Sequence, residues 1–235
     1  ASRRFTVGAS GATFESAVAG TTWTVAGGSW GGSYSVSVGG NVTFAGAGNI
    51  DFSQALTGAI SVTKTGGGNL TLGATNTYTG GTTVHAGNIN LTGTLANNAS
   101  APITVNSGGT FTFGRSDTFG NHTANVVTPI TINAGGTVTN SGSFFNRLST
   151  LTLNGGTLTS TGGATQAGLD GPLAWALAGS VTVNSSTQST ISGTGNVMLG
   201  SASVTGTTFN VSDGAAAIDL LISANLIDSS TSTWG

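Results

Sequence analysis

The sequence predicts an all-β protein that folds as a single-stranded parallel β-helix, a β-solenoid of about ten coils. Triplets of an apolar residue, Thr or Ser, and a second apolar residue recur along most of the 235 residues, and glycine-rich turns separate them. Side chains alternate between the two faces of a strand, so each triplet buries its apolar residues and exposes its Thr. Strands this short need neighbours, which stacked coils provide.

The composition indicates an ordered chain with little charge. Charged residues make up 5% of the sequence, against about 25% in a typical soluble domain, and the formal net charge is -2. Disordered chains are usually poor in β-branched residues and highly charged. Here Val, Ile and Thr are abundant and patterned. We therefore expect ordered β structure with a thin core.

Several classes of partner are excluded by the same composition. Only five residues are Lys or Arg, so no basic stripe is available to bind nucleic acid. No run of about 18 apolar residues is present, so no membrane insertion by this chain is expected. The absence of Cys excludes disulfides and thiolate metal sites. We treat residues 1–235 as one domain.

The first 34 residues are irregular, with Trp23, Trp30 and Tyr34 among glycines. We expect residues 1–34 to form an N-terminal cap or irregular first coils. A cap would bury these rings over the first coil, whereas a binding platform would stack them on sugar rings.

Residues 35–214 carry the regular pattern and are expected to form the regular coils. Tight glycine turns supply positive φ without a steric clash. From Val62, the apolar anchors follow at intervals of 22, 19, 27, 21 and 30 residues by subtraction of residue numbers, at Val84, Ile103, Ile130, Leu151 and Val181. The longer intervals require loops, and residues 113–126 are a candidate. The triplets are Val36-Ser37-Val38, Leu70-Thr71-Leu72, Ile103-Thr104-Val105, Phe111-Thr112-Phe113, Ile130-Thr131-Ile132, Leu151-Thr152-Leu153 and Val181-Thr182-Val183.

Two later stretches depart from the pattern. Residues 163–178 contain Pro172 and Trp175, and we expect a loop or a short helical turn there. Residues 215–227 are the most apolar run, and we expect strands rather than a capping helix because Ile218-Asp219-Leu220 echoes Ile50-Asp51-Phe52. Residues 215–235 are therefore expected to form a terminal coil, either cut in mid-module or serving as an end for assembly.

Residues 60–91 resemble the autotransporter-associated β-strand repeat, also called the passenger-associated transport repeat, and the other coils agree with it only in style. The resemblance implies a right-handed parallel β-helix in a large bacterial surface or secreted protein, and it implies no particular activity. The matching residues are Lys64, Thr65, Gly66, Gly68, Leu70, Leu72, Asn76, Thr77, Tyr78, Thr79, Gly80, Gly81, Thr82, Val84, Ala86 and Gly87.

The acidic residues give little support to catalysis. Glycosidic chemistry would require two carboxylates, or a carboxylate with a cation, converging in a groove. The seven acids are widely spaced, and Asp170 and Asp213 each precede a Gly, which is typical of turns. If the chain were a glycan-active enzyme, Arg115, Asp117 and His122 in one loop would be the best candidates.

No catalytic, cofactor-binding or metal-binding residues are predicted, and no cofactor is expected. His85 and His122 are too isolated for zinc, which usually needs three or four clustered ligands. The Gly pairs lack the Gly-Lys-Ser/Thr of a phosphate-binding loop.

Threonine pairs in successive copies are the remaining candidate for a binding face. A flat Thr-x-Thr face could bind ice or glycan, although β propensity explains Thr equally well. The pairs are Thr110/Thr112, Thr137/Thr139 and Thr157/Thr159.

We therefore expect a non-enzymatic structural segment of an extracellular or bacterial cell-surface protein, acting as a stalk, an adhesin passenger or a self-stacking fibre subunit. The expected partners are other copies of the chain, end to end or lateral, and a surface glycan. The alternatives are a glycan-active β-helix enzyme and a glycan- or ice-binding module.

Overall fold

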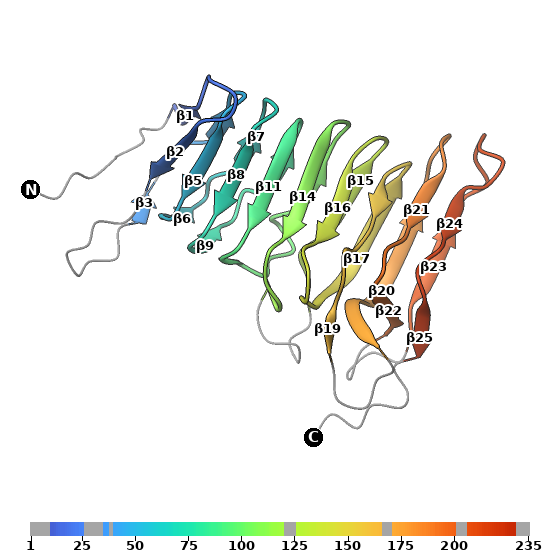
Figure 1. The fold of residues 1–235 in the computed structure, drawn as a ribbon. Helices are drawn as coiled ribbons and strands as arrows, with labels where there is room; N and C mark the ends of the chain where they lie inside the picture. The colour runs from blue at the N-terminus through green and yellow to red at the C-terminus, as the bar shows by residue number, and fades with distance from the viewer. Residues whose placement is uncertain are drawn as a thin grey trace, which may run out of the picture.

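The computed structural model describes residues 10–25, 35–37, 40–119, 126–165, 171–200 and 206–228. In these ranges the chain forms 25 strands and no helix, and the strands stack side by side along one axis (Figure 1). Strands of consecutive coils pair in parallel, which confirms the predicted parallel β-helix. Each coil contributes to three faces of the stack.

The bounds of the strands follow the three faces. The first face consists of β1 (Ala12–Glu15), β4 (Val42–Ala45), β7 (Val62–Lys64), β10 (Thr82–Val84), β13 (Ile103–Val105), β15 (Ile130–Asn133), the second halves of β17 (Asn146–Asn154) and β20 (Pro172–Val183), and β23 (Thr208–Val211). The second face consists of β2 (Thr22–Val25), β5 (Asn49–Phe52), β8 (Asn69–Leu72), β11 (Gly87–Leu91), β14 (Gly109–Phe113), β16 (Thr137–Asn140), β18 (Thr157–Leu158), β21 (Ser189–Ile191) and β24 (Leu220–Ile222). The third face consists of β3 (Ser35–Ser37), β6 (Ala55–Gly58), β9 (Thr75–Tyr78), β12 (Thr94–Leu95), the first halves of β17 and β20, β22 (Asn196–Leu199) and β25 (Leu226–Asp228).

The second face shows the number of coils directly, because its nine strands pair in one unbroken order from β2 to β24. The described residues therefore form nine coils. Strands in a sheet lie about 4.8 Å apart, so eight spacings give a stack roughly 38 Å long. The core lies between the three faces. At its beginning, Phe14 stacks on Phe44 with ring centroids 5.4 Å apart, and Phe44 meets Phe52 edge-on at 5.1 Å.

The register of the first face differs from the predicted anchors at one step. Val62 pairs with Thr82, and Val84 pairs with Lys64, so the step is 20 residues (82 − 62) and not 22. The apolar pattern misplaces this step because two polar residues, Thr82 and Lys64, face inward and are both 2% exposed. The Tyr78 hydroxyl satisfies Thr82 through a hydrogen bond of 2.6 Å. The later anchors pair as predicted, from Ile103 through Ile130 and Leu151 to Val181.

The expectation of a loop or helical turn over residues 163–178 was wrong for residues 172–178, which belong to the 12-residue strand β20. Trp175 is fully buried, and its indole Nε1–H donates to the Thr159 carbonyl at 2.9 Å. Pro172 is the first residue of β20, a position where a strand tolerates the missing N–H. β19 (Ala164–Thr165) pairs antiparallel with the beginning of this strand.

The ninth coil contains the strands expected in residues 215–227, but the echo between Ile218 and Ile50 is out of register. Ile222 pairs with Ile191, and that inward column leads back through the second face to Ile50. Ile218 lies before β24 and is 52% exposed. A short apolar motif therefore recurs in the sequence without occupying the same place in the coil.

Candidate functional site

The outer surface of the second face presents two columns of polar side chains. Residues two apart on a strand point to the same side, so each strand contributes one side chain to each column. The first column is Thr22, Asn49, Asn69, Asn88, Thr110, Thr137, Thr157 and Thr190, and the second is Thr24, Asp51, Thr71, Asn90, Thr112 and Thr139.

The register confirms that the predicted Thr pairs occupy matching places. Thr110 pairs with Thr137 and Thr137 with Thr157, while Thr112 pairs with Thr139. Thr159 follows β18, where its backbone N–H donates to the Val138 carbonyl at 2.9 Å. Asn replaces Thr in the first column of coils two to four. A complete Thr-x-Thr strand is therefore confined to a short part of this face.

A longer threonine column lies on the first face, where the pattern of apolar-Thr-apolar triplets is most regular. Eight threonines stack in successive coils and Asn210 follows them. All the pairs are in register, and each threonine lies between two residues that face inward. The members are Thr13, Thr43, Thr63, Thr83, Thr104, Thr131, Thr152 and Thr182.

The second face also contains a groove of about 310 Å³, lined by side chains of coils one to four. Asn90 Oδ1 is buried and has no hydrogen-bond partner among the described residues. Asn49 Oδ1 accepts a hydrogen bond from the Asn69 backbone N–H at 3.0 Å, which ties adjacent coils together. The lining residues are Thr22, Asn49, Ile50, Asp51, Asn69, Thr71, Asn88 and Asn90.

The corner after β7 is organised by the single lysine of the chain. Lys64 faces the core, where its stem follows the inward column of Phe44 and Val84. Its Nζ donates to the carbonyls of Thr65 at 2.8 Å and Gly66 at 2.7 Å. Burial lowers the pKa of Lys64 to about 8. The side chain therefore holds the turn and is not presented to a ligand.

His85 begins a ladder of side-chain amides at the corner between the first and second faces. Its Nδ1 lies 3.3 Å from Asn106 Nδ2. Asn133 Nδ2 donates to Asn106 Oδ1 at 2.7 Å, and Asn154 Nδ2 donates to Asn133 Oδ1 at 2.9 Å. Reasoning from the sequence missed this ladder, although the signal was present as an Asn after each triplet in ITVN, ITIN and LTLN.

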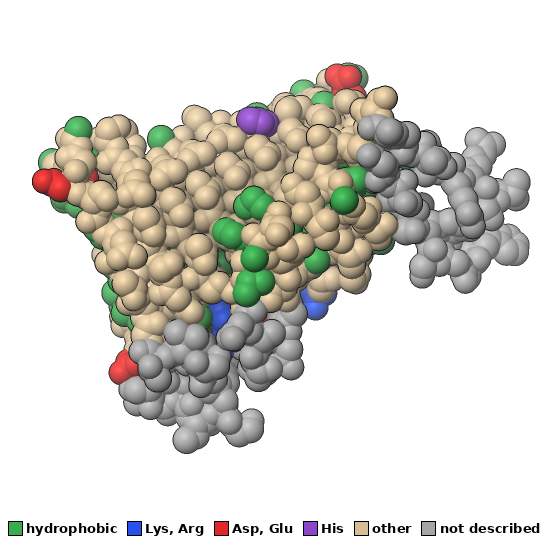
Figure 2. Space-filling model, turned by 180° about the vertical axis from the view of Figure 1, so that it is seen from behind, with side chains coloured by type: hydrophobic (Ala, Val, Ile, Leu, Met, Phe, Trp, Pro, Cys, Tyr) green, Lys and Arg blue, Asp and Glu red, His purple; other side chains and the backbone are tan. Residues whose placement is uncertain are grey.

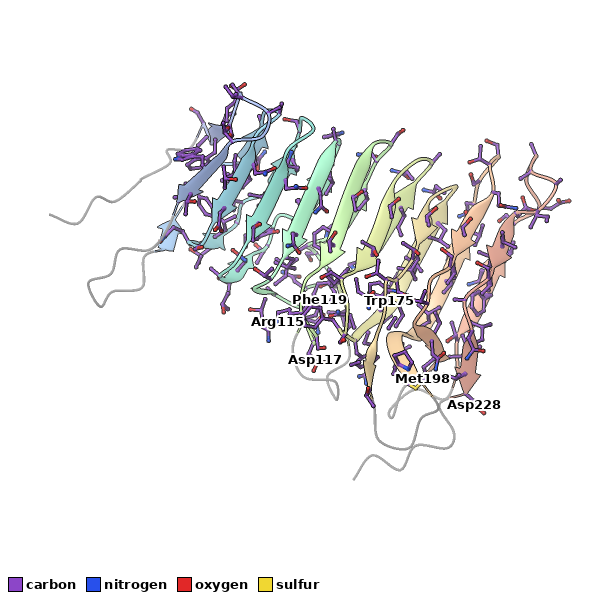
Figure 3. The ribbon with its side chains drawn as sticks, in the orientation of Figure 1. Arg115, Asp117, Phe119, Trp175, Met198 and Asp228 are labelled. Atoms are coloured by element: carbon purple, nitrogen blue, oxygen red, sulfur yellow. The ribbon has the colours of Figure 1, made fainter. Side chains whose placement is uncertain are left out.

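Arg115 and Asp117, the best catalytic candidates, lie in a segment that replaces a strand of the third face (Figure 3). The Leu95 N–H donates to the Thr118 carbonyl at 3.0 Å, and the Asp117 N–H donates to the Phe145 carbonyl at 3.1 Å. Asp117 adopts a left-handed backbone with φ 52°. The segment thus joins β12 to β17.

Side chains fix the same segment. Asn146 Nδ2 donates to the Arg115 carbonyl at 2.8 Å, while Asn146 Oδ1 accepts from the Thr118 N–H at 3.0 Å. Burial lowers the pKa of Arg147, and the nearby Asp117 carboxylate opposes this shift. These contacts assign Arg115 and Asp117 a part in closing the third face.

The remaining candidates are scattered or lie outside the described residues. Asp213 follows β23 in coil nine, four coils and roughly 19 Å along the axis from Asp117 in coil five. His122, Asp170, Trp30 and Tyr34 lie outside the described residues. Within the described ranges, no group of three or more His, Cys, Asp or Glu could hold a metal ion.

Trp23 belongs to the first coil rather than to a separate aromatic platform. It pairs with Ile50 and so occupies an inward column, yet it remains 38% exposed because no described strand covers β2 from outside. Phe14 packs against it with ring centroids 5.8 Å apart.

Figure 2 shows the molecule from behind, where uncharged side chains dominate and acidic ones gather toward the ends. No helix of the described residues is long and apolar enough to cross a membrane.

Comparison with known proteins agrees with this architecture. Residues 62–91 match the family model of the passenger-associated-transport-repeat. No curated protein and no solved structure matches the chain. The matched residues run from β7 to β11, which is one complete coil and the first two strands of the next. The chain therefore contains a repeat that is typical of passenger segments of autotransporter-type proteins.

Proposed function

We propose that this chain is a non-enzymatic structural segment of a bacterial surface or secreted protein, and that it works as a stalk or fibre by stacking coil on coil. The passenger-associated-transport-repeat at residues 62–91 supports the structural role and the location outside the cell. The separation of Asp117 from Asp213 and the structural contacts of Arg115 and Asp117 support a role without chemistry.

The observation that carries the proposal is the opening of the core at the ninth coil. Val183 is fully buried, but Val211, its partner in the next coil, is 47% exposed. Val197 is fully buried, but its partner Leu226 is 40% exposed. No described strand pairs with the outer edge of β24. Such an end is complementary to a further coil, which would cover the apolar residues and pair the strand edges.

The first coil offers a matching surface. Trp23 lies in an inward column and is 38% exposed, and β2 pairs only with β5 among the described strands. A second copy of the chain, placed with its first coil on the ninth coil, would continue all three faces in parallel. Because the two surfaces differ, this contact is head to tail and builds an open rod. The low charge of the chain leaves little repulsion to oppose it.

The test is the state of the isolated chain as its concentration is raised, measured by sedimentation velocity and negative-stain electron microscopy. We expect rods whose lengths are multiples of one monomer. The double variant Val211→Lys/Leu226→Lys places two charges on the exposed end and should leave monomers. Val127→Lys is the matched control, because Val127 is 44% exposed but lies away from both terminal coils. A chain that stays monomeric at every concentration, or rods that persist in the double variant, would refute the proposal.

A further inference from the structure

We propose that the groove on coils one to four of the second face is a binding site for an uncharged, extended oligosaccharide. This site goes beyond the proposed stacking function, because it lies on a side of the rod and not at an end. Its lining comes from four consecutive strands, β2, β5, β8 and β11, and its volume of about 310 Å³ lies within the usual range for ligand sites.

The chemistry of the lining matches sugar hydroxyls. The side chains that line the groove are amides and hydroxyls with a single carboxylate. An amide offers two N–H donors and a carbonyl acceptor, and a Thr hydroxyl both donates and accepts. A sugar hydroxyl also donates and accepts, so it can pair with either group. The one apolar lining residue, Ile50, is 2% exposed and directs its side chain into the core.

Part of this hydrogen-bonding capacity is unused by the protein. Asn90 Oδ1 is buried without a partner among the described residues, whereas buried polar atoms normally have one. Its neighbour Asn88 differs, because Asn88 Oδ1 accepts from the Thr112 hydroxyl at 2.9 Å. A hydroxyl donated by a ligand in the groove would satisfy Asn90 Oδ1. This atom therefore marks the floor of the proposed site.

The charge of the groove selects against acidic glycans. Asp51 is its only charged lining residue, and no Lys or Arg lines it. The Asp51 carboxylate accepts a hydrogen bond from the Ser53 hydroxyl at 3.4 Å. An anionic sugar placed there would be repelled, whereas a neutral sugar could donate hydroxyls to the carboxylate. The same carboxylate interrupts the regular hydroxyl array that a flat ice-binding surface would need.

The periodicity of the coils indicates the shape of the ligand. Successive strands lie about 4.8 Å apart, which is comparable to the length of one sugar ring. Four coils span three spacings, roughly 14 Å, so a short linear chain would lie along the axis with about one ring per coil. The two polar columns, two residues apart on each strand, would contact opposite edges of each ring.

The experiment measures binding of defined probes to the full chain by isothermal titration calorimetry. The probes are cellotetraose, maltotetraose and mannotetraose as neutral chains and tetragalacturonate as an anionic chain. The groove variant is Asn69→Ala/Thr71→Ala, which removes two lining side chains of β8. The matched control is Thr137→Ala/Thr139→Ala, which changes the same two columns in β16, outside the groove.

We expect at least one neutral tetrasaccharide to bind, the groove variant to weaken this binding at least tenfold, and the control variant to change it less than twofold. Asp51→Asn should increase the binding of tetragalacturonate. The proposal is overturned if no neutral probe binds, if both double variants weaken binding equally, or if tetragalacturonate binds the wild-type chain best. Rod formation, measured on the same samples, is independent of these outcomes and separates this site from the stacking function.

Discussion

Replacing three consecutive glycines by Ala, one at a time, separates two demands of the corner that follows β7. Gly66 has φ +74°, and a Cβ there would lie 2.5 Å from the Gly46 carbonyl oxygen of the preceding coil. Gly68 has no positive φ, but its Cβ would collide with the Gly48 carbonyl oxygen. Gly67 has neither constraint, because a Cβ added there would meet no atom within 4 Å and its φ is not positive.

The expected magnitudes follow from these differences. A left-handed residue with a Cβ costs about 1–2 kcal/mol. Overpacking costs about 1–3 kcal/mol. Gly66→Ala should therefore destabilise the protein by about 2–5 kcal/mol, and Gly68→Ala by about 1–3 kcal/mol, because only Gly66 carries both costs. Gly67→Ala should stabilise it by about 0.4–1 kcal/mol, since Ala restricts the unfolded chain.

Thermal and urea unfolding followed by far-ultraviolet circular dichroism measure these changes. For a chain of this length 1 kcal/mol shifts Tm by roughly 2–4 °C, so Gly66→Ala should lower Tm by at least about 4 °C. Gly67→Ala is the internal control, because it makes the same chemical change one residue away. Equal destabilisation by Gly66→Ala and Gly67→Ala, or no effect of Gly66→Ala, would refute the reasoning that stacking restricts this corner.

Two further predictions concern polar groups inside the stack. The stability of the wild type should rise with pH from about 8 toward 10.5, because in this range folded Lys64 has lost a proton that the unfolded chain still holds, and urea titrations of Lys64→Met should lack this rise. Above pH 10.0 stability should fall, because burial raises the pKa of Tyr78 and the folded phenol keeps a proton that the unfolded one loses; a fall that persists in Tyr78→Phe would contradict this. Asn133→Asp should cost about 1–3 kcal/mol in urea unfolding, because it removes the N–H that Asn106 Oδ1 accepts, whereas Asn184→Asp keeps the acceptor for the Ser212 hydroxyl and should change stability by less than about 0.5 kcal/mol; equal losses would count against the amide ladder.

The alternation of residues in the triplets predicted which side chains face inward. Thr104, Thr131 and Thr152 point outward between buried apolar neighbours, as period-two alternation requires. The pattern could not predict the step from Val62, because inward Thr82 is satisfied by Tyr78 and inward Lys64 by turn carbonyls. These partners become neighbours only when the coil closes.

The segments that break the pattern were the hardest to predict. Residues 172–178 contain Pro172 and Trp175, which suggest a loop, but Trp175 fills the core beside Phe113 with ring centroids 5.4 Å apart. Arg115 and Asp117 look like a reactive pair in the sequence, yet hydrogen bonds from Asn146 hold their segment in the third face. In both cases the deciding contacts come from residues at least sixteen positions away.

The sequence by itself determined the parallel β-helix, the outward threonines and the glycine corners, because alternation and positive φ are local properties of the chain. Only the tertiary structure decided the register between Val62 and Thr82, the groove around Asn90, and the exposure of Val211 and Leu226. Each of these depends on which coil lies above or below a residue, and stacking distance is a long-range property that a repeat of varying length does not encode locally.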